Sequence, residues 1–200
     1  MGDWLRVGAA VKFSLGSAGL GGGRGLHAKV GGLLREKREG DGCAPAGIFA
    51  LTSLFGDAAP DSLFAHATKL PYMQATADLK AIDDPSSRFY NQIVDQSAVT
   101  NPDWQSSEDM LRSDQRYAVG AVVAHNSEPA EPGAGSCIFI HVWEKEGAPT
   151  AGCTAMSLDD MTEIAGWLDG AAAPVLVQLP QVEYESLRAV WELPAFVAQG

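Results

Sequence analysis

The 200-residue sequence has few basic side chains, few cysteines and no long apolar segment. Its 14 lysines and arginines stand against 25 acidic residues, and the net charge is −11. The chain therefore lacks the clustered positive charge from which nucleic-acid binding gains its affinity. No apolar run approaches the ~18 residues needed to span a bilayer. We expect neither a nucleic-acid partner nor a membrane span.

The three cysteines, Cys43, Cys137 and Cys153, are odd in number and widely spaced. This pattern does not indicate a disulfide framework, and it leaves at least one thiol to be explained. The first residues, MGDWLRVGAA, lack the basic and apolar regions of a secretory signal. We therefore expect either a cytoplasmic protein or a mature chain without its leader.

Dense turn residues and scarce helical periodicity predict a mainly β protein with a few short helices, in one domain over residues 1–200. The segment from about 56 to 104 is rich in Pro, Asp and Ser, and we expect an irregular excursion over the surface. Strands are predicted at 4–15, 28–42 (with a charged turn), 47–51, 117–126, 136–143 and 174–180, and short helices at 106–112, 157–169 and 183–191.

The helix at about 157–169 has the clearest local signal. Ser157 can cap its N-terminus, with Asp160 at the third helical position. Apolar residues then recur at helical spacing, and Gly170 follows as a stop signal.

The segment HVWEKEGAPTAGC, residues 141–153, has the pattern most suggestive of chemistry. Period-2 alternation in SCIFIHVW places Cys137 and His141 on one face of a strand, so the His141 ring can face a groove. Gly152 allows a close backbone approach before Cys153. A thiol beside turn amides and an imidazole is expected to have a lowered pKa, and the Gly152 and Cys153 amides could hold an oxyanion. The pair is either a base and a nucleophile or two buried side chains that never meet.

Several further residues have a structural interpretation, and most of them also have a functional one. Cys137, in an apolar strand, is interpreted as a small buried side chain. His125 is a satisfied core histidine or, with Asn126, lines a groove. Trp143 either walls the site or packs in the core. Tyr90 and Asn91 lie in the irregular segment and could belong to a lid over the site.

The same His-to-Cys segment resembles the active-site motif of the YkuD-type L,D-transpeptidases, in which a His and a loop are followed by Ser/Thr-x-Gly-Cys. The similarity covers roughly residues 35–180. Other segments similar to one bacterial branch of this family are KREGDGCAPAGIFAL (37–51), DDPSSRFYNQIVD (83–95), HN (125–126) and GSCIFIHVW (135–143).

The resemblance implies a β-sandwich catalytic domain that acts on peptidoglycan stem peptides. By position, Cys153 matches the nucleophile and His141 the general base, whereas Thr150, Ala151 and Gly152 match the positions that shape the oxyanion side. The thiolate would attack a carbonyl beside an L-centre, and an amine of diaminopimelate would take the acyl group from the thioester. Candidate substrate contacts are His125, Asn126, Trp143, Ser136 and Tyr90.

The sequence departs from the family pattern at several positions. Ala151 stands where His or Arg is commoner, no Arg or Asn follows Cys153 within two residues, and the His-to-Cys loop is shorter than usual. These departures concern how the acceptor carboxylate is held, and they slightly favour 1,3-links from L-alanine over 3,3-links between diaminopimelates. Cys43 replaces the usual Thr before Pro45 and is interpreted as an ordinary structural loop thiol.

Two other classes of function are compatible with the sequence. A hydrolase on the same scaffold would use Cys153 and His141 with water as acceptor. The other class is a non-catalytic peptidoglycan-binding or zinc-binding domain. Zinc needs three or four converging ligands, and His125, Cys137, His141 and Cys153 include no close-spaced pair such as Cys-x-x-Cys, so we expect no metal and no cofactor. The implied substrate lies outside the cytoplasmic membrane, so we expect a periplasmic or envelope location. The sequence gives no indication of the oligomeric state.

Overall fold

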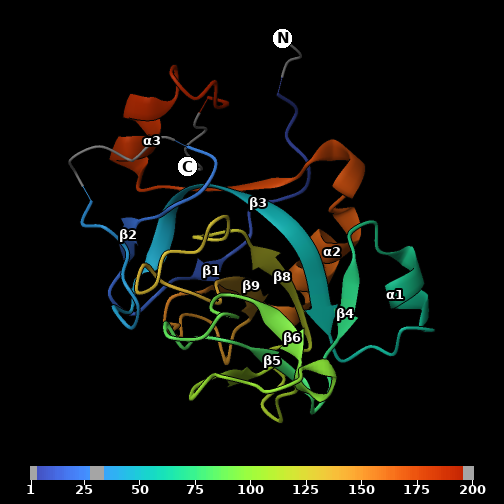
Figure 1. Ribbon diagram of the computed structural model, residues 1–200. Coiled ribbons are helices and arrows are strands. Elements are labelled where there is room, and N and C mark those ends of the chain that lie inside the picture. The colour runs from blue at the N-terminus through green and yellow to red at the C-terminus, as the bar shows by residue number, and fades with distance from the viewer. Residues whose placement is uncertain (1–3, 28–33, 196–200) are drawn as a thin grey trace.

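The computed structural model describes residues 4–27 and 34–195, and this part of the chain is mainly β, with 27% strand and 15% helix (Figure 1). The helices are α1 (Leu63–Ala67), α2 (Leu158–Trp167) and α3 (Gln181–Leu187), with 3₁₀ turns η1 (Gln96–Ala98) and η2 (Gly170–Ala172). The strands are β1 (Phe13–Ser14), β2 (Leu20–Gly22), β3 (Ala44–Gly56), β4 (Tyr72–Gln74), β5 (Leu79–Ala81), β6 (Ile93–Asp95), β7 (Glu108–Asp109), β8 (Val119–Val123), β9 (Phe139–Val142), β10 (Thr154–Met156) and β11 (Val175–Gln178).

The large sheet has the strand order β1-β10-β9-β8-β3-β11. Strands β2 and β4 pair with the two ends of β3, which curves across the molecule and bulges between Leu51 and Leu54 (Figure 1). Strand β10 is parallel to β9, with Ala155 opposite His141. A parallel pair requires a crossover, so the loop 143–153 brings the chain back to the start of β9. Cys153 consequently lies beside Phe139.

Side-chain alternation along β9 divides the interior into two cores. Ile138 and Ile140 face the larger core, which is covered by α2. Cys137 and Phe139 face a second core that includes residues of β5. The predicted alternation is thus confirmed, and Cys153 packs against the second core. The buried residues of the second core are Phe55, Ala75, Ala81, Met110, Tyr117, Cys137 and Phe139.

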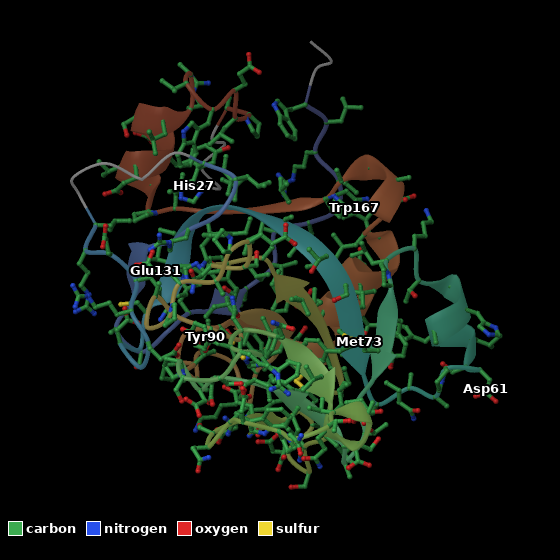
Figure 2. The ribbon with its side chains drawn as sticks, in the orientation of Figure 1. His27, Asp61, Met73, Tyr90, Glu131 and Trp167 are labelled. Atoms are coloured by element: carbon green, nitrogen blue, oxygen red, sulfur yellow. The ribbon has the colours of Figure 1, made fainter. Side chains whose placement is uncertain are left out.

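A small sheet of order β6-β5-β7 forms most of the lower part of the molecule in Figure 1. The segment 56–104, expected to be irregular, contributes β5 and β6 to this sheet as well as α1 and β4. It is therefore more regular than its composition indicates. Helix α1 and Asp61 lie at the right-hand edge of the molecule, away from the small sheet (Figure 2).

Most predicted elements are confirmed within a few residues, and two are wrong. The predicted strand 4–15 is reduced to β1, because only Phe13 and Ser14 have a partner strand and most of the preceding residues are exposed. The predicted helix 106–112 is instead strand β7 and a turn, because Glu108 and Asp109 pair with β5 and a helix this short is marginal by itself. Of the predicted strand 28–42, residues 28–33 lie outside the described residues, and the remainder shows an isolated bridge at Glu36 and a turn.

Helix α2 begins where the sequence indicates. The Ser157 side chain accepts a hydrogen bond from the Asp160 N–H at 3.1 Å, and Met161 and Ala165 are its buried residues. The helix ends at Trp167, before Gly170, which opens the turn η2. Cys153 lies only a few residues before Ser157. The hydrogen bond that fixes the start of α2 therefore also restricts where the loop that ends at Cys153 can lie.

Candidate active site

Cys153 ends the crossover loop and immediately precedes β10. Its Sγ accepts a hydrogen bond from the Phe139 N–H at 3.3 Å and lies 3.7 Å from the carbonyl oxygen of Cys137. The parallel register pairs Thr154 with Ile140, so the side chain of Cys153 is on the same face of the sheet as those of Phe139 and His141. The nucleophile candidate and the base candidate are therefore two strand positions apart on adjacent strands.

His141 is buried, and its ring is oriented by two neighbours. Nδ1 lies 2.8 Å from the carbonyl oxygen of Val142. Because a carbonyl only accepts hydrogen bonds, Nδ1 carries the proton and Nε2 keeps its lone pair. The ring of Tyr117 packs edge-on at 5.3 Å between centroids. This arrangement fixes the tautomer that a general base requires.

One cavity of about 330 Å³ contains both candidate residues. The structure also places the predicted residues Thr150, Ala151 and Trp143 in its lining. The remaining lining residues were not identified from the sequence, and they are Glu108, Arg112, Arg116, Tyr117, Glu144, Ala148, Pro149 and Ala155.

The electrostatic environment keeps the resting thiol neutral. Burial and the negative charge of Glu108 raise the pKa of Cys153 to about 12, and the hydrogen bond from Phe139 only partly opposes them. Burial, aided by Arg112 and Arg116, lowers the pKa of His141. The lowered thiol pKa expected from the sequence is therefore wrong, because turn amides do not offset desolvation and a buried carboxylate. The site holds a neutral thiol and a neutral imidazole.

The residues before Cys153 form a tight turn. Thr150 Oγ1 donates to the carbonyl oxygen of Cys153 at 2.6 Å and accepts from the Gly152 N–H at 3.2 Å. Gly152 is needed because a Cβ at this position would lie 3.0 Å from the carbonyl oxygen of Cys43. The Gly152 amide, expected to hold an oxyanion, is thus occupied by Thr150. The Thr150 hydroxyl thus fixes the backbone of Gly152 and Cys153.

His125 and Asn126 are fully buried and do not reach the cavity of Cys153. His125 accepts from the Arg24 N–H through Nδ1 at 3.2 Å and donates to the Ala134 carbonyl through Nε2 at 3.0 Å. Burial lowers its pKa to about 4. The Asn126 amide group bonds to the backbone of Glu131. Both side chains border a larger cavity of about 1550 Å³, and their hydrogen bonds agree with the core interpretation.

Ser136 and Tyr90 are also absent from the lining of the Cys153 cavity. The hydroxyl of Ser136 donates to Glu39 Oε2 at 2.8 Å, and the hydroxyl of Tyr90 donates to the same oxygen. Tyr90 comes from the loop between β5 and β6 and lies inside the molecule where this loop meets the rest of the fold (Figure 2). Through Glu39, the two residues therefore join the small-sheet region to the irregular segment that leads to β9.

Asn91, which the sequence suggests as a lid residue together with Tyr90, does not line the Cys153 cavity and instead links three backbone segments. Its Oδ1 accepts from the Cys137 N–H at 2.8 Å, and its Nδ2 donates to the carbonyl oxygens of His125 and Asn126 at 2.9 and 2.7 Å. Asn91 and Cys137 both have positive φ, at 63° and 53°. The carbonyl of Cys137 faces the thiol of Cys153, so Asn91 fixes the backbone beside the nucleophile.

Glu108, Arg112 and Tyr117 enter the cavity lining from a stretch without a recognisable motif. The pairing of β7 with β5 brings Glu108 and Arg112 to the cavity, and the start of β8 positions Tyr117. Tyr117 is the first residue of the predicted strand 117–126, but no local sequence signal indicates which cavity its side chain faces. Within the described residues, no three His, Cys, Asp or Glu side chains converge as a metal site would require.

Comparison with known families agrees with this geometry. Residues 12–177 match the model of the YkuD family, described as the L,D-transpeptidase catalytic domain. Because the match spans most of the chain, the protein belongs to the YkuD family, and its mainly β fold is consistent with the β-sandwich of that family. The family acts on cell-wall peptidoglycan, which implies an envelope location. No curated protein and no solved structure gives a significant match. In residues 4–27 and 34–195, no helix is long and apolar enough to cross a membrane.

Proposed function

We propose that this protein is a peptidoglycan L,D-transpeptidase that crosslinks stem peptides through a thioester on Cys153. The observation that carries the proposal is the shared cavity of Cys153 and His141. The carbonyl of Val142 holds Nδ1 of the imidazole and leaves Nε2 able to accept a proton. Membership of the YkuD family supports the choice of substrate class.

In the acylation step, Cys153 Sγ attacks the donor carbonyl beside an L-centre while His141 Nε2 takes the thiol proton. Because the thiol pKa is raised and the imidazole pKa lowered, no thiolate stands ready, and proton transfer accompanies the attack. We assign the oxyanion to the backbone N–H of Cys153, since that of Gly152 is bonded to Thr150. The imidazolium then protonates the leaving amine, and the thioester stays on the enzyme.

In the transfer step, an amine of diaminopimelate attacks the thioester and His141 returns a proton to the sulfur. Arg112 and Arg116 line the cavity in ion pairs with Asp114 and Glu144, and we assign the acceptor carboxylate to this charged group in place of the Arg that is missing after Cys153. The short His-to-Cys loop favours 1,3-links from L-alanine over 3,3-links.

The test is incubation of the purified protein with disaccharide-peptide donors and acceptors, followed by mass spectrometry. Crosslinked dimers that are absent with Cys153→Ala support the proposal. Shortened monomers alone would indicate a hydrolase, and an unchanged substrate would contradict both activities. Fragmentation of the dimers distinguishes 1,3-links from 3,3-links.

Fractionation of the native cells should place the protein in the periplasm or envelope; confinement to the cytosol would contradict this location.

A further inference from the structure

Glu108 is a carboxylate in the wall of the active-site cavity whose presence the thiol–imidazole pair does not explain. Its strand, β7, pairs with β5 through Ala81, and this pairing carries Glu108 to the cavity that holds Cys153 and His141. Glu108 Oε2 accepts a hydrogen bond from the Tyr117 hydroxyl at 2.6 Å. In the described part of the chain, Oε1 has no hydrogen-bond partner. One oxygen is therefore fixed, and the other is available to a ligand.

Among the residues that the structure describes, no basic side chain forms an ion pair with Glu108. Arg112 is the nearest basic contributor, but its guanidinium forms two hydrogen bonds to Asp114, at 2.9 and 2.6 Å. Burial raises the pKa of Glu108, and the negative charges of Asp83 and Glu39 add to this effect. Oδ1 of Asp83 is itself buried without a partner in the described residues. The cavity wall also contains Arg112 and Arg116, but in the described residues their ion pairs are with Asp114 and Glu144, so the charge of Glu108 is left unpaired and a bound cation would stabilise it.

The proposed reaction brings a cation into this cavity. The acceptor amine of diaminopimelate is an ammonium group at neutral pH, and it must lose a proton to become a nucleophile. The cavity of about 330 Å³ is small enough that an ammonium held at Glu108 shares it with the thioester on Cys153.

We propose that Glu108 binds the ammonium group of the acyl acceptor and removes the proton that this group must lose before it attacks the thioester. This inference rests on the proposed transpeptidase function. The ammonium gives one proton to Glu108, which later passes it to solvent. The neutral nitrogen attacks the thioester carbon, the C–S bond breaks, and the second nitrogen proton moves to His141 Nε2 and then to Cys153 Sγ. The products are an amide and the free thiol.

Water carries no charge, so the role of Glu108 is specific to amine acceptors. Loss of its charge should therefore impair aminolysis of the thioester more than hydrolysis. A larger loss of aminolysis than of hydrolysis would indicate that Glu108 binds the acceptor. A merely structural role of Glu108 would lower both rates together.

The test is Glu108→Gln, which retains an oxygen for the Tyr117 hydroxyl and removes the charge. The protein is first loaded with a donor peptide, and the thioester is measured by intact mass. An amine-bearing acceptor peptide is then added, and crosslinked and hydrolysed products are counted. We expect the ratio of crosslinked to hydrolysed product to fall about ten- to hundredfold, as for the loss of a hydrogen bond to a charged group. The KM for the acceptor should rise, and hydrolysis should stay within about twofold.

The matched control is Asp109→Asn. Asp109 is the next residue of β7, is exposed and pairs with Lys80 outside the cavity, so its variant should keep the wild-type ratio. An unchanged ratio in Glu108→Gln, or an equal loss of both reactions, would overturn the assignment. Failure of the wild type to form a thioester would overturn the proposed function and the assignment with it.

A second measurement does not depend on acyl transfer. The charge of Glu108 raises the pKa of Cys153, so Glu108→Gln should lower that pKa and speed alkylation of the thiol at pH 8 severalfold. An unchanged alkylation rate would show that the charge of Glu108 does not affect the thiol of Cys153. It would then overturn the placement on which the assignment depends.

Discussion

The backbone N–H of Phe139 donates a hydrogen bond to Sγ of Cys153 at 3.3 Å. This contact links the nucleophile candidate to the first residue of β9, the strand that carries His141. Because β9 and β10 are parallel and adjacent, the geometry of the thiol and imidazole is set by the main sheet and not by the crossover loop alone.

The first prediction concerns the pH dependence of thiol alkylation. The pKa of Cys153 is raised to about 12, so its thiolate fraction should increase about tenfold per pH unit between pH 7 and 10. Labelling with an uncharged alkylating reagent, read by peptide mapping, should show this slope. Cys153 should still react before Cys43 and Cys137, because both of these thiols are buried. A plateau below pH 8 would contradict the neutral resting thiol.

The second prediction separates the base from the scaffold. His141→Ala should slow thioester formation by about 10²- to 10⁴-fold, because His141 supplies the one imidazole base among the described residues that line the cavity. Cys137→Ala should leave thioester formation nearly intact, since the Cys137 thiol is buried and contacts the Ile82 carbonyl, not the cavity. Intact-mass kinetics with a donor peptide measures both variants. Equal rates for His141→Ala and wild type would eliminate His141 as the base.

The third prediction concerns Thr150. Thr150→Val keeps the shape of the side chain but removes the hydrogen bonds to the Cys153 carbonyl and from the Gly152 amide. We expect a loss of about 1–3 kcal/mol in the free energy of unfolding and at least a tenfold loss of thioester formation. Thr150→Ser keeps the hydroxyl and should recover most of both. If the serine variant is as impaired as the valine variant, the hydroxyl is not the important group.

The fourth prediction is a pH dependence of stability from His125. Its pKa is lowered to about 4 in the folded protein, against about 6.5 in an unfolded chain. The unfolded state therefore binds the extra proton between these values, and the free energy of unfolding should fall as pH decreases from 6.5 to 4, by about 3 kcal/mol. Burial lowers the pKa of His141 in the same direction.

Chemical denaturation at several pH values measures this slope. His125→Gln cannot be protonated, so its free energy of unfolding should depend less on pH over the same window, whatever its stability at pH 7. A slope equal to that of the wild type would assign the acid sensitivity to other groups. Carboxylates such as Asp114, whose pKa is lowered to about 2, contribute mainly below this window.

The sequence alone determined the local features. The alternation around Cys137 and His141 depends only on strand geometry, and the start of α2 depends on the hydrogen bond between Ser157 and Asp160. Both are short-range effects that the residue types decide. The resemblance of the His-to-Cys segment to the YkuD motif likewise indicated which two side chains would share a cavity.

Tertiary structure decided the remainder, because it depends on contacts between distant segments. Residues 106–112 have local signals for a helix, yet pairing with β5 makes Glu108 and Asp109 a strand and brings Glu108 to the cavity. Residues 4–12 alternate like a strand but have no partner ladder. The pKa of Cys153 is raised because desolvation and the charge of Glu108 outweigh the local amides. Burial and long-range charge depend on the whole fold, and no spacing within HVWEKEGAPTAGC encodes them.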